Sequence, residues 1–179
     1  MFILASKSPR RQELLKKIVP EFKIVVPDID ENILVSIPSD TAKIISKFKA
    51  YKIFASYPEA TVLACDTIVV IDGELLGKPK DARDAKRMLK KLSGRKHHVI
   101  SGFTLLGPNI EINKNIVTEV YFNDLGDELI DEYIKTGSPF DKAGAYGIQD
   151  EAFALVRSIK GSYYNVMGLP VEALRKVIK

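Results

Sequence analysis

The amino-acid sequence predicts an α/β or α+β fold built around a mixed β-sheet. Apolar runs typical of buried strands alternate along the chain with segments whose apolar residues recur at helical spacing. Two long segments, 98–106 and 110–122, flank a Gly-Pro-Asn turn and therefore predict an antiparallel pair within the sheet. Helices that accompany such strands pack against the faces of one sheet.

The first elements are a strand and a helix. Phe2 to Ala5 is a short apolar run that predicts a buried strand. Ser8 is typical of a helix N-cap, and Pro9 follows at the first helical position, where its missing N–H costs nothing. We expect this helix to end before Pro20. Its inward-facing positions are Leu14, Leu15 and Ile18.

A second strand and a longer helix come next. We expect the strand over 22–26 and then an acidic loop over 28–31. Ser39, after Pro38, is expected to open the helix. The apolar residues that keep helical spacing in it are Ile44, Ile45, Phe48, Tyr51 and Ala55.

The strongest strand signal is the run from Val62 to Ile71, which is apolar on both faces, as central strands are. The Asp72-Gly73 pair is typical of a turn, and a short strand leads from it to Gly77. Further helices are expected over 81–92, over 127–135 and from Pro170 onward.

Length and composition fit one globular domain. The chain has 179 residues, which at about 150 residues per domain predicts a single domain over 1–179. Apolar residues make up 46%, enough to bury a core. The net charge of +4 excludes an acidic disordered tail. The pI of about 9.0 arises from scattered lysines, which argues against a nucleic-acid partner.

The cysteine count and the hydropathy pattern indicate in which cellular compartment the protein is expected. One cysteine permits no intramolecular disulfide, which suits a reducing cytosol. No stretch reaches the ~18 uninterrupted apolar residues of a membrane span, and the first residues lack the charge order of a signal peptide. We therefore expect a cytoplasmic protein without a membrane partner.

The segment from Ser6 to Arg11 is the first candidate for chemistry. It lies at a strand-to-helix junction, where free N–H groups and the helix dipole attract anions. Arg10 and Arg11 lie in the first turn, where positive charges interact unfavourably with that dipole. Such an unfavourable local arrangement is expected mainly at functional sites. Their planar guanidinium groups suit phosphate oxygens. The alternative is a solvated helix start whose arginines pair with acidic neighbours.

Asp66 is the second candidate because it interrupts the apolar run of the central strand. An unpaired carboxylate there would cost several kcal/mol. Asp66 must therefore pair with a cation, bind a metal or be strongly hydrogen-bonded, and a structural carboxylate at the strand end is the alternative. Strand alternation places Thr67 on the opposite face, together with Cys65.

Two weaker candidates supply oxygens and cations. Asp28, Asp30 and Glu31 offer the oxygen ligands that Mg²⁺ or Mn²⁺ prefers, although a solvated acidic turn is the better explanation for any one of them alone. Lys49, Lys52 and Lys78 are candidate phosphate partners in a chain rich in lysine, and Lys78 gains slightly from its rigid Gly-Lys-Pro setting.

The loop over 142–149 is the last candidate. Its two glycines let the backbone approach a ligand closely, and the Gln149 amide can present both donor and acceptor to a base edge. An ordinary loop explains the glycines as well. No phosphate-binding loop of the common NTPases and no dinucleotide fingerprint is present in the sequence.

Taken together, these motifs resemble one family, the Maf-like nucleoside triphosphate pyrophosphatases. The matching segments run in order from end to end of the chain, and their combination is highly specific. They are LASKSPRRQELL from Leu4, DIDE from Asp28, KA at Lys49, ACDTIVV from Ala64, GKP at Gly77, LSGRKHHV from Leu92, DKAGAYGIQ from Asp141 and YNVMGLP from Tyr164.

The resemblance implies hydrolysis of a nucleoside triphosphate to its monophosphate and pyrophosphate with a divalent cation, Mg²⁺ or Mn²⁺. It also implies an elongated, two-lobed fold related to the inosine-triphosphate pyrophosphatases, with a cleft between the lobes. The Asp66-Thr67 pair and the AYGIQ loop resemble the branch that acts on dTTP and UTP. The branch that acts on 7-methyl-GTP tends to carry SDQ and a Trp in an SPWR motif, whereas this chain has Thr67, Arg10 and no Trp.

The resemblance also assigns roles by matching position. Asp66 is the expected proton acceptor, and Arg10, Thr67 and Gln149 are the expected base-specificity residues. We expect Glu31 and Asp66 to hold the cation. The residues expected to bind the substrate are Ser6, Arg10, Arg11, Lys49 and Lys78.

Other functions stay open at this point. Because family members have been linked with cell division and septum formation, a non-catalytic regulator that binds nucleotide or nucleic acid is the alternative from another class. A pure binder has no need of Asp66 and Glu31 among the lysines, which argues against it. A nearer alternative is house-cleaning hydrolysis of modified pyrimidine nucleotides such as 5-methyl-UTP. A homodimer is expected by analogy alone.

Overall fold

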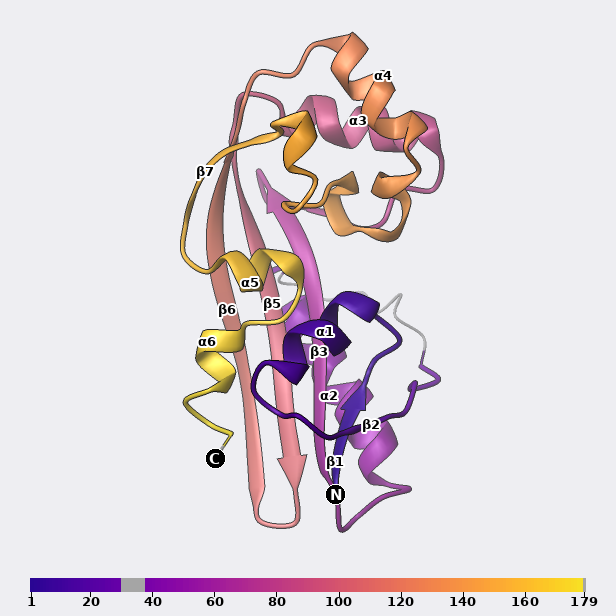
Figure 1. Ribbon diagram of the computed structural model, residues 1–179, viewed down its shortest axis with the longest axis vertical. Helices are drawn as coiled ribbons and strands as arrows, with labels where there is room; N and C mark the ends of the chain where they lie inside the picture. The colour runs from indigo at the N-terminus through magenta and orange to yellow at the C-terminus, as the bar shows by residue number, and fades with distance from the viewer. Residues whose placement is uncertain (30–37, 179) are drawn as a thin grey trace.

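The computed structural model describes residues 1–29 and 38–178, and within them seven strands form one mixed sheet (Figure 1). Its order is β2-β1-β3-β5-β6-β7, with β4 paired to β3 beside β1. The strands are β1 (Phe2–Ala5), β2 (Lys23–Ile24), β3 (Thr61–Ile71), β4 (Glu74–Leu76), β5 (Lys96–Gly107), β6 (Ile110–Phe122) and β7 (Val156–Lys160). β1 runs parallel to β2 and β3, and the other pairs are antiparallel. The predicted mixed sheet is confirmed.

The helices gather in two groups along the sheet (Figure 1). One end carries α3 (Ala82–Leu92) and α4 (Asp127–Lys135). The other end carries α1 (Pro9–Lys16), α2 (Thr41–Phe54), α5 (Tyr163–Met167) and α6 (Val171–Leu174). Short 3₁₀ turns lie at Pro38–Asp40, Ser138–Asp141, Ala143–Ala145 and Glu151–Phe153.

Each group of helices encloses its own apolar core. Leu89 of α3 and Tyr133 of α4 pack with Phe122 at one end of the sheet. Leu14 of α1 packs with Phe103 at the other end. The helix α2 covers the opposite face there, with a separate core around Ala50 and Val62. Long strands β3, β5 and β6 connect the two groups (Figure 1).

The edge of β3 is open for a few residues, and this opening positions the site. β1 pairs with β3 only as far as Ala64, and β4 begins to pair at Val69. Among the described residues, the stretch from Cys65 to Ile68 therefore pairs with β5 alone. Side chains on both faces of this stretch border the same opening.

Local sequence signals explain the helix starts. The Ser8 hydroxyl accepts the Arg11 N–H at 3.4 Å and Pro9 begins α1, as predicted. Ser162 likewise caps α5 by accepting the Asn165 N–H at 3.0 Å. The sequence pattern did not predict this short helix.

Two expected boundaries were wrong. The strand predicted over 22–26 pairs only at Lys23–Ile24, because short β1 offers partners only at Ile3 and Leu4. The helix expected to open at Ser39 begins at Thr41, since the residues from Pro38 form a 3₁₀ turn first. Within the part of the chain that the structure describes, no helix combines the length and the apolar character that crossing a membrane requires.

Candidate active site

A cleft of about 1160 Å³ lies at the open edge of β3. Its walls come from both groups of helices, since the segment 5–11 forms one side and the loop 141–149 contributes to the other. Most of the residues singled out in the sequence line it together. They are Ser6, Arg10, Arg11, Lys49, Asp66, Thr67, Lys78 and Gln149. Glu31 lies outside the described residues.

Asp66 and Lys49 form an ion pair at the floor of the cleft. The Lys49 ammonium, from α2, donates to Asp66 Oδ1 at 2.8 Å. The two side chains are only 6% and 13% exposed, respectively. Asp66 Oδ2 accepts no hydrogen bond from the described residues. One carboxylate oxygen is thus held by the ammonium, and the other has no donor within residues 1–29 and 38–178.

Gly102 explains how α2 comes so close to the sheet. It is the register partner of Asp66 on β5, and a Cβ built on it would lie 2.2 Å from the backbone of Ala42 in α2. Lys49 follows Ala42 by seven residues, which is about two helical turns and therefore the same face. The missing side chain at Gly102 lets α2 lie directly on β5 and brings Lys49 to Asp66.

The arginines of α1 have partners from the far end of the chain. Arg10 Nη1 donates to Asp141 Oδ2 at 2.8 Å, and Arg11 Nε donates to the Gly168 carbonyl at 2.9 Å. Arg10 thus has an acidic partner, as the alternative interpretation of this segment predicted, and both arginines still line the cleft. Buried Ser6 accepts the Ser8 N–H at 3.1 Å, which fixes the turn that precedes them.

Thr67 faces the opposite side of β3 from Asp66, as strand alternation predicted. Its hydroxyl lies 2.8 Å from Ser101 Oγ and 3.3 Å from the Gly168 carbonyl. Arg11 Nη2 also donates to it at 3.3 Å. The Thr67 hydroxyl is therefore fixed by α1, β5 and the end of α5.

The loop that carries Gln149 is tied to the Gly77-Lys78-Pro79 segment. The Gly144 N–H donates to the Gly77 carbonyl at 3.0 Å. Gly144 has a φ of +70°, and a Cβ on it would lie 2.9 Å from the Val69 side chain. Glycine is required here both for its backbone conformation and for the close approach to β3.

Two pKa shifts define the electrostatics around the cleft. Partial burial acts to raise the pKa of Asp141, but hydrogen bonds from Lys142 and Arg10 outweigh it and hold that pKa below its usual value. Burial raises the pKa of the Cys65 thiol beside Asp66, so it stays protonated at neutral pH. A protonated, buried thiol is a packing group rather than a nucleophile.

The donor set suits a hard divalent cation. Asp66 and the exposed Asp28 both line the cleft, and Mg²⁺ commonly takes one or two protein carboxylates together with substrate phosphates. No cluster of three metal-binding side chains occurs within residues 1–29 and 38–178. A site completed by phosphate oxygens is consistent with that finding.

Several residues around the cleft were not identified as site residues from the sequence. Asp141 pairs with Arg10 across 131 positions of the chain, and Tyr133 and Asp150 contact each other behind Gln149. Their residue types are common on surfaces and in cores. The only available signal was the proximity of Asp141 and Asp150 to the glycine-containing loop.

Comparison with known proteins places these motifs in context. Residues 1–179 match the family described as Maf-like protein. A dTTP/UTP pyrophosphatase of Carboxydothermus hydrogenoformans is 46% identical, over 98% of this chain and 96% of that protein. One of Symbiobacterium thermophilum is 48% identical over 95% and 88%, and one of Thermococcus gammatolerans is 46% identical over 99% and 95%.

The fold has a counterpart among solved structures. The Ham1 protein of Staphylococcus aureus aligns with a TM-score of 0.56 over 98% of this chain and 96% of that one. At 16% sequence identity this likeness concerns the fold alone. It confirms the fold class that the sequence predicts.

Proposed function

The chain belongs to the Maf-like protein family, and from that premise we propose that it hydrolyses dTTP and UTP to the monophosphate and pyrophosphate. Relatives with 46–48% identity over nearly the whole chain carry the name dTTP/UTP pyrophosphatase. The structural observation that carries the proposal is the buried Lys49–Asp66 pair at the floor of a cleft lined by Arg10 and Lys78.

The cations of the cleft suit a triphosphate. Lys49, Lys78 and Arg10 line one cavity, so a bound triphosphate meets positive charge from both sides of the cleft. Charge-assisted hydrogen bonds to phosphate oxygens are roughly twice as strong as neutral ones. Hydrolysis forms a bond from water oxygen to the α-phosphorus and breaks the bond from that phosphorus to the bridging oxygen. Pyrophosphate leaves with the electron pair.

Asp66 is the group that accepts the proton of the attacking water. Lys49 holds Oδ1, and Oδ2 accepts no hydrogen bond from the described residues, which suits it to a water molecule. A divalent cation held by Asp66 and Glu31 would neutralise phosphate charge and lower the pKa of the water. In phosphoryl transfer most of the rate enhancement comes from positioning and electrostatics, which these fixed charges supply.

Base selection belongs to Arg10, Thr67 and Gln149. All three line the cleft, and their hydrogen-bonding groups come from three different elements. The amide of Gln149 can donate to and accept from a pyrimidine edge. Thr67, fixed by Ser101 and Gly168, shapes the wall beside it.

A nucleotide panel tests the proposal. Pyrophosphate release is measured from dTTP, UTP, dCTP, CTP, dATP and dGTP, and from 5-methyl-UTP, with Mg²⁺ and with EDTA. We expect release from dTTP and UTP above the other standard nucleotides, and its loss in EDTA. Equal rates with all bases would contradict the assigned specificity. The absence of release from every nucleotide, with DNA binding that weakens steeply with salt, would favour a regulator instead.

A further inference from the structure

Gln149 sits in a short turn that a single phenol closes. The Asp150 N–H donates to the Gly147 carbonyl at 3.1 Å, which defines a turn over 147–150. Tyr133, from α4, touches both ends of this turn. Its hydroxyl accepts the Gly147 N–H at 3.0 Å and donates to Asp150 Oδ2 at 2.5 Å.

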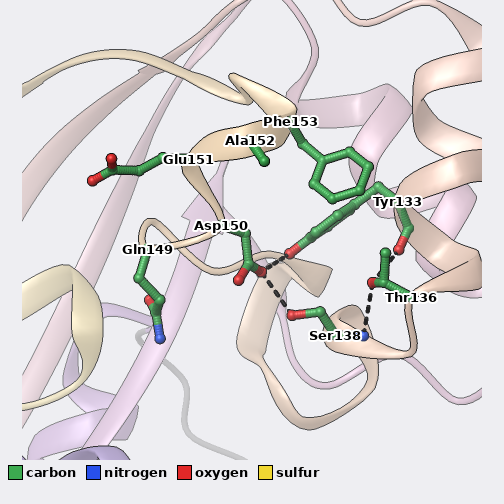
Figure 2. A pocket seen from close by; sticks show the side chains of 8 residues that line it. All are labelled: Tyr133, Thr136, Ser138, Gln149, Asp150, Glu151, Ala152 and Phe153. Carbon is green, nitrogen blue, oxygen red and sulfur yellow. Dashed lines mark hydrogen bonds between the residues drawn. The ribbon is translucent and has the colours of Figure 1, made fainter.

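Asp150 and the preceding residue, Gln149, point their side chains in opposite directions. Figure 2 shows the Asp150 carboxylate pointing toward Tyr133 and Ser138, while the Gln149 side chain points away from them. Gln149 lines both the large cleft and a separate cavity of about 290 Å³ behind the turn. Of these two cavities, Tyr133 and Asp150 line the rear one and not the cleft.

The contact between Tyr133 and Asp150 is buried and closely packed. The Tyr133 side chain is fully buried, and Ser138 Oγ donates to the same Asp150 oxygen at 2.7 Å. A Cβ on Gly147 would lie 2.9 Å from Asp150 Oδ2 and 2.8 Å from the Lys142 side chain, so a larger residue there would displace these two side chains. Burial of the ring, and then its hydrogen bond to Asp150, raise the pKa of Tyr133, so the hydroxyl keeps its proton.

The same network reaches Arg10. Lys142 Nζ donates to Ser138 Oγ at 3.0 Å and to Asp141 Oδ1 at 2.8 Å. The other oxygen of Asp141 accepts from Arg10 at 2.8 Å. A continuous chain of hydrogen bonds therefore links the turn that carries Gln149 to Arg10 on the facing wall.

We infer that the Tyr133 hydroxyl and the Asp150 carboxylate form a clamp that positions Gln149 for base selection. This inference rests on the proposed function, because it assigns a task to residues behind the same cleft. Tyr133 and Asp150 are positioning residues, since they contact the turn that carries Gln149 and neither of them lines the cleft.

Removing the hydroxyl tests the clamp. In Tyr133→Phe the Gly147 N–H loses its phenol acceptor and Asp150 keeps only the Ser138 side chain as a donor, so Gln149 is held less firmly in one orientation. We expect the preference for dTTP over dCTP, measured as a ratio of kcat/KM values, to fall by about ten-fold. We expect KM for dTTP to rise and kcat to change little, because the clamp affects how the base is bound and does not contact the reacting atoms.

A double variant separates positioning from a general loss of structure. If Tyr133 acts through Gln149, adding Tyr133→Phe to Gln149→Ala lowers the dTTP preference no further than Gln149→Ala alone. Tyr121→Phe is the matched control: that hydroxyl donates to Glu119 at 2.9 Å, outside the cleft lining, and its removal is expected to leave the preference unchanged.

Two outcomes would overturn the inference. One is a folded Tyr133→Phe variant with the wild-type dTTP preference, and the other is a double variant whose losses simply add. Should Tyr133→Phe fail to fold, Asp150→Asn, which keeps an acceptor oxygen, is compared with Asp150→Ala, and equal preferences in the two would also contradict the clamp. If instead the wild-type chain releases no pyrophosphate at all, the proposed function fails and not the clamp alone.

Discussion

At the floor of the cleft, one ammonium and one carboxylate lie 2.8 Å apart with little exposure to solvent. Withdrawing two charges from water costs several kcal/mol per ion, and their attraction offsets this only when the geometry is good. Lys49 and Asp66 therefore add little net stability compared with apolar residues of the same size. Their retention in the core points to chemistry rather than to folding.

Replacing one or both partners separates these roles. Lys49→Met leaves the Asp66 carboxylate without its ammonium and is expected to lower the free energy of unfolding by about 3 kcal/mol. Adding Asp66→Leu is expected to restore most of that loss while turnover stays absent. Urea unfolding monitored by circular dichroism measures both variants. A double variant less stable than Lys49→Met would contradict this interpretation of the pair.

Base selection is tested at Gln149. Gln149→Ala removes the amide from the cleft and is expected to lower the preference for dTTP over dCTP by about ten- to two-hundred-fold. Steady-state kinetics with both nucleotides measure it. Gln12→Ala, on α1 and outside the cleft lining, is the control and is expected to behave as wild type. An unchanged preference in Gln149→Ala would remove Gln149 from the specificity set.

At the scale of elements, the contact between α2 and β5 sets the site. Gly102 lets the two backbones approach, and the register of β3 and β5 places this contact opposite Asp66. The cleft then opens where β1 stops pairing and β4 has not begun. Strand lengths and one glycine, rather than any catalytic side chain, decide where the Lys49–Asp66 pair meets the solvent.

Gly102→Ala tests that contact. The added methyl group would lie 2.2 Å from the α2 backbone, so α2 must shift. Overpacking of this kind costs about 1–3 kcal/mol or more, and we expect turnover to fall together with stability because Lys49 moves with the helix. Gly126→Ala is the control, since nothing lies within 4 Å of a Cβ there. It should cost about 1 kcal/mol or less and leave turnover intact. Thermal unfolding and kinetics of both variants decide between these expectations.

At the scale of the whole molecule, the predictable part of the structure follows from local signals. The Ser8-Pro9 helix start, the long apolar run of β3 and the β5–β6 pair all depend on neighbours in the sequence. The Asp66 environment was also foreseeable, because a carboxylate in an apolar strand requires a partner.

The rest depends on contacts between distant segments. Nothing near Arg10 indicates that Asp141 will reach it, and the Tyr133–Asp150 clamp joins a helix to a loop that folds back on it. Two-residue β2 exists only because β1 lies beside it. These features follow from tertiary packing, which cannot be predicted from local patterns in a single sequence.

Buried His97 makes the stability of the molecule depend on pH. Burial, with a smaller contribution from His98, lowers the pKa of His97 to about 3 from the ordinary 6.5. The unfolded chain thus binds a proton below pH 6.5 that the folded chain refuses, and stability falls as the pH falls. Between pH 7 and pH 5 the expected loss is about 2 kcal/mol.

Urea unfolding at pH 7, 6 and 5 measures that slope. His97→Phe, which keeps a ring beside Phe122 but cannot titrate, should lose most of the dependence in this window. Equal slopes in wild type and variant would mean that other groups govern the acid response.

The most direct test of the proposed reaction compares two identical chemical changes on one strand and the turn that follows it. Asp66→Asn keeps the shape of the side chain but removes its capacity to accept a proton. Asp72→Asn makes the same change at an exposed carboxylate that pairs with Arg95 at 2.8 Å, outside the cleft lining. Pyrophosphate release from dTTP is measured for both. We expect kcat to fall at least about a hundred-fold in Asp66→Asn and to stay at the wild-type value in Asp72→Asn. Wild-type turnover by a folded Asp66→Asn protein would contradict the central role given to this carboxylate.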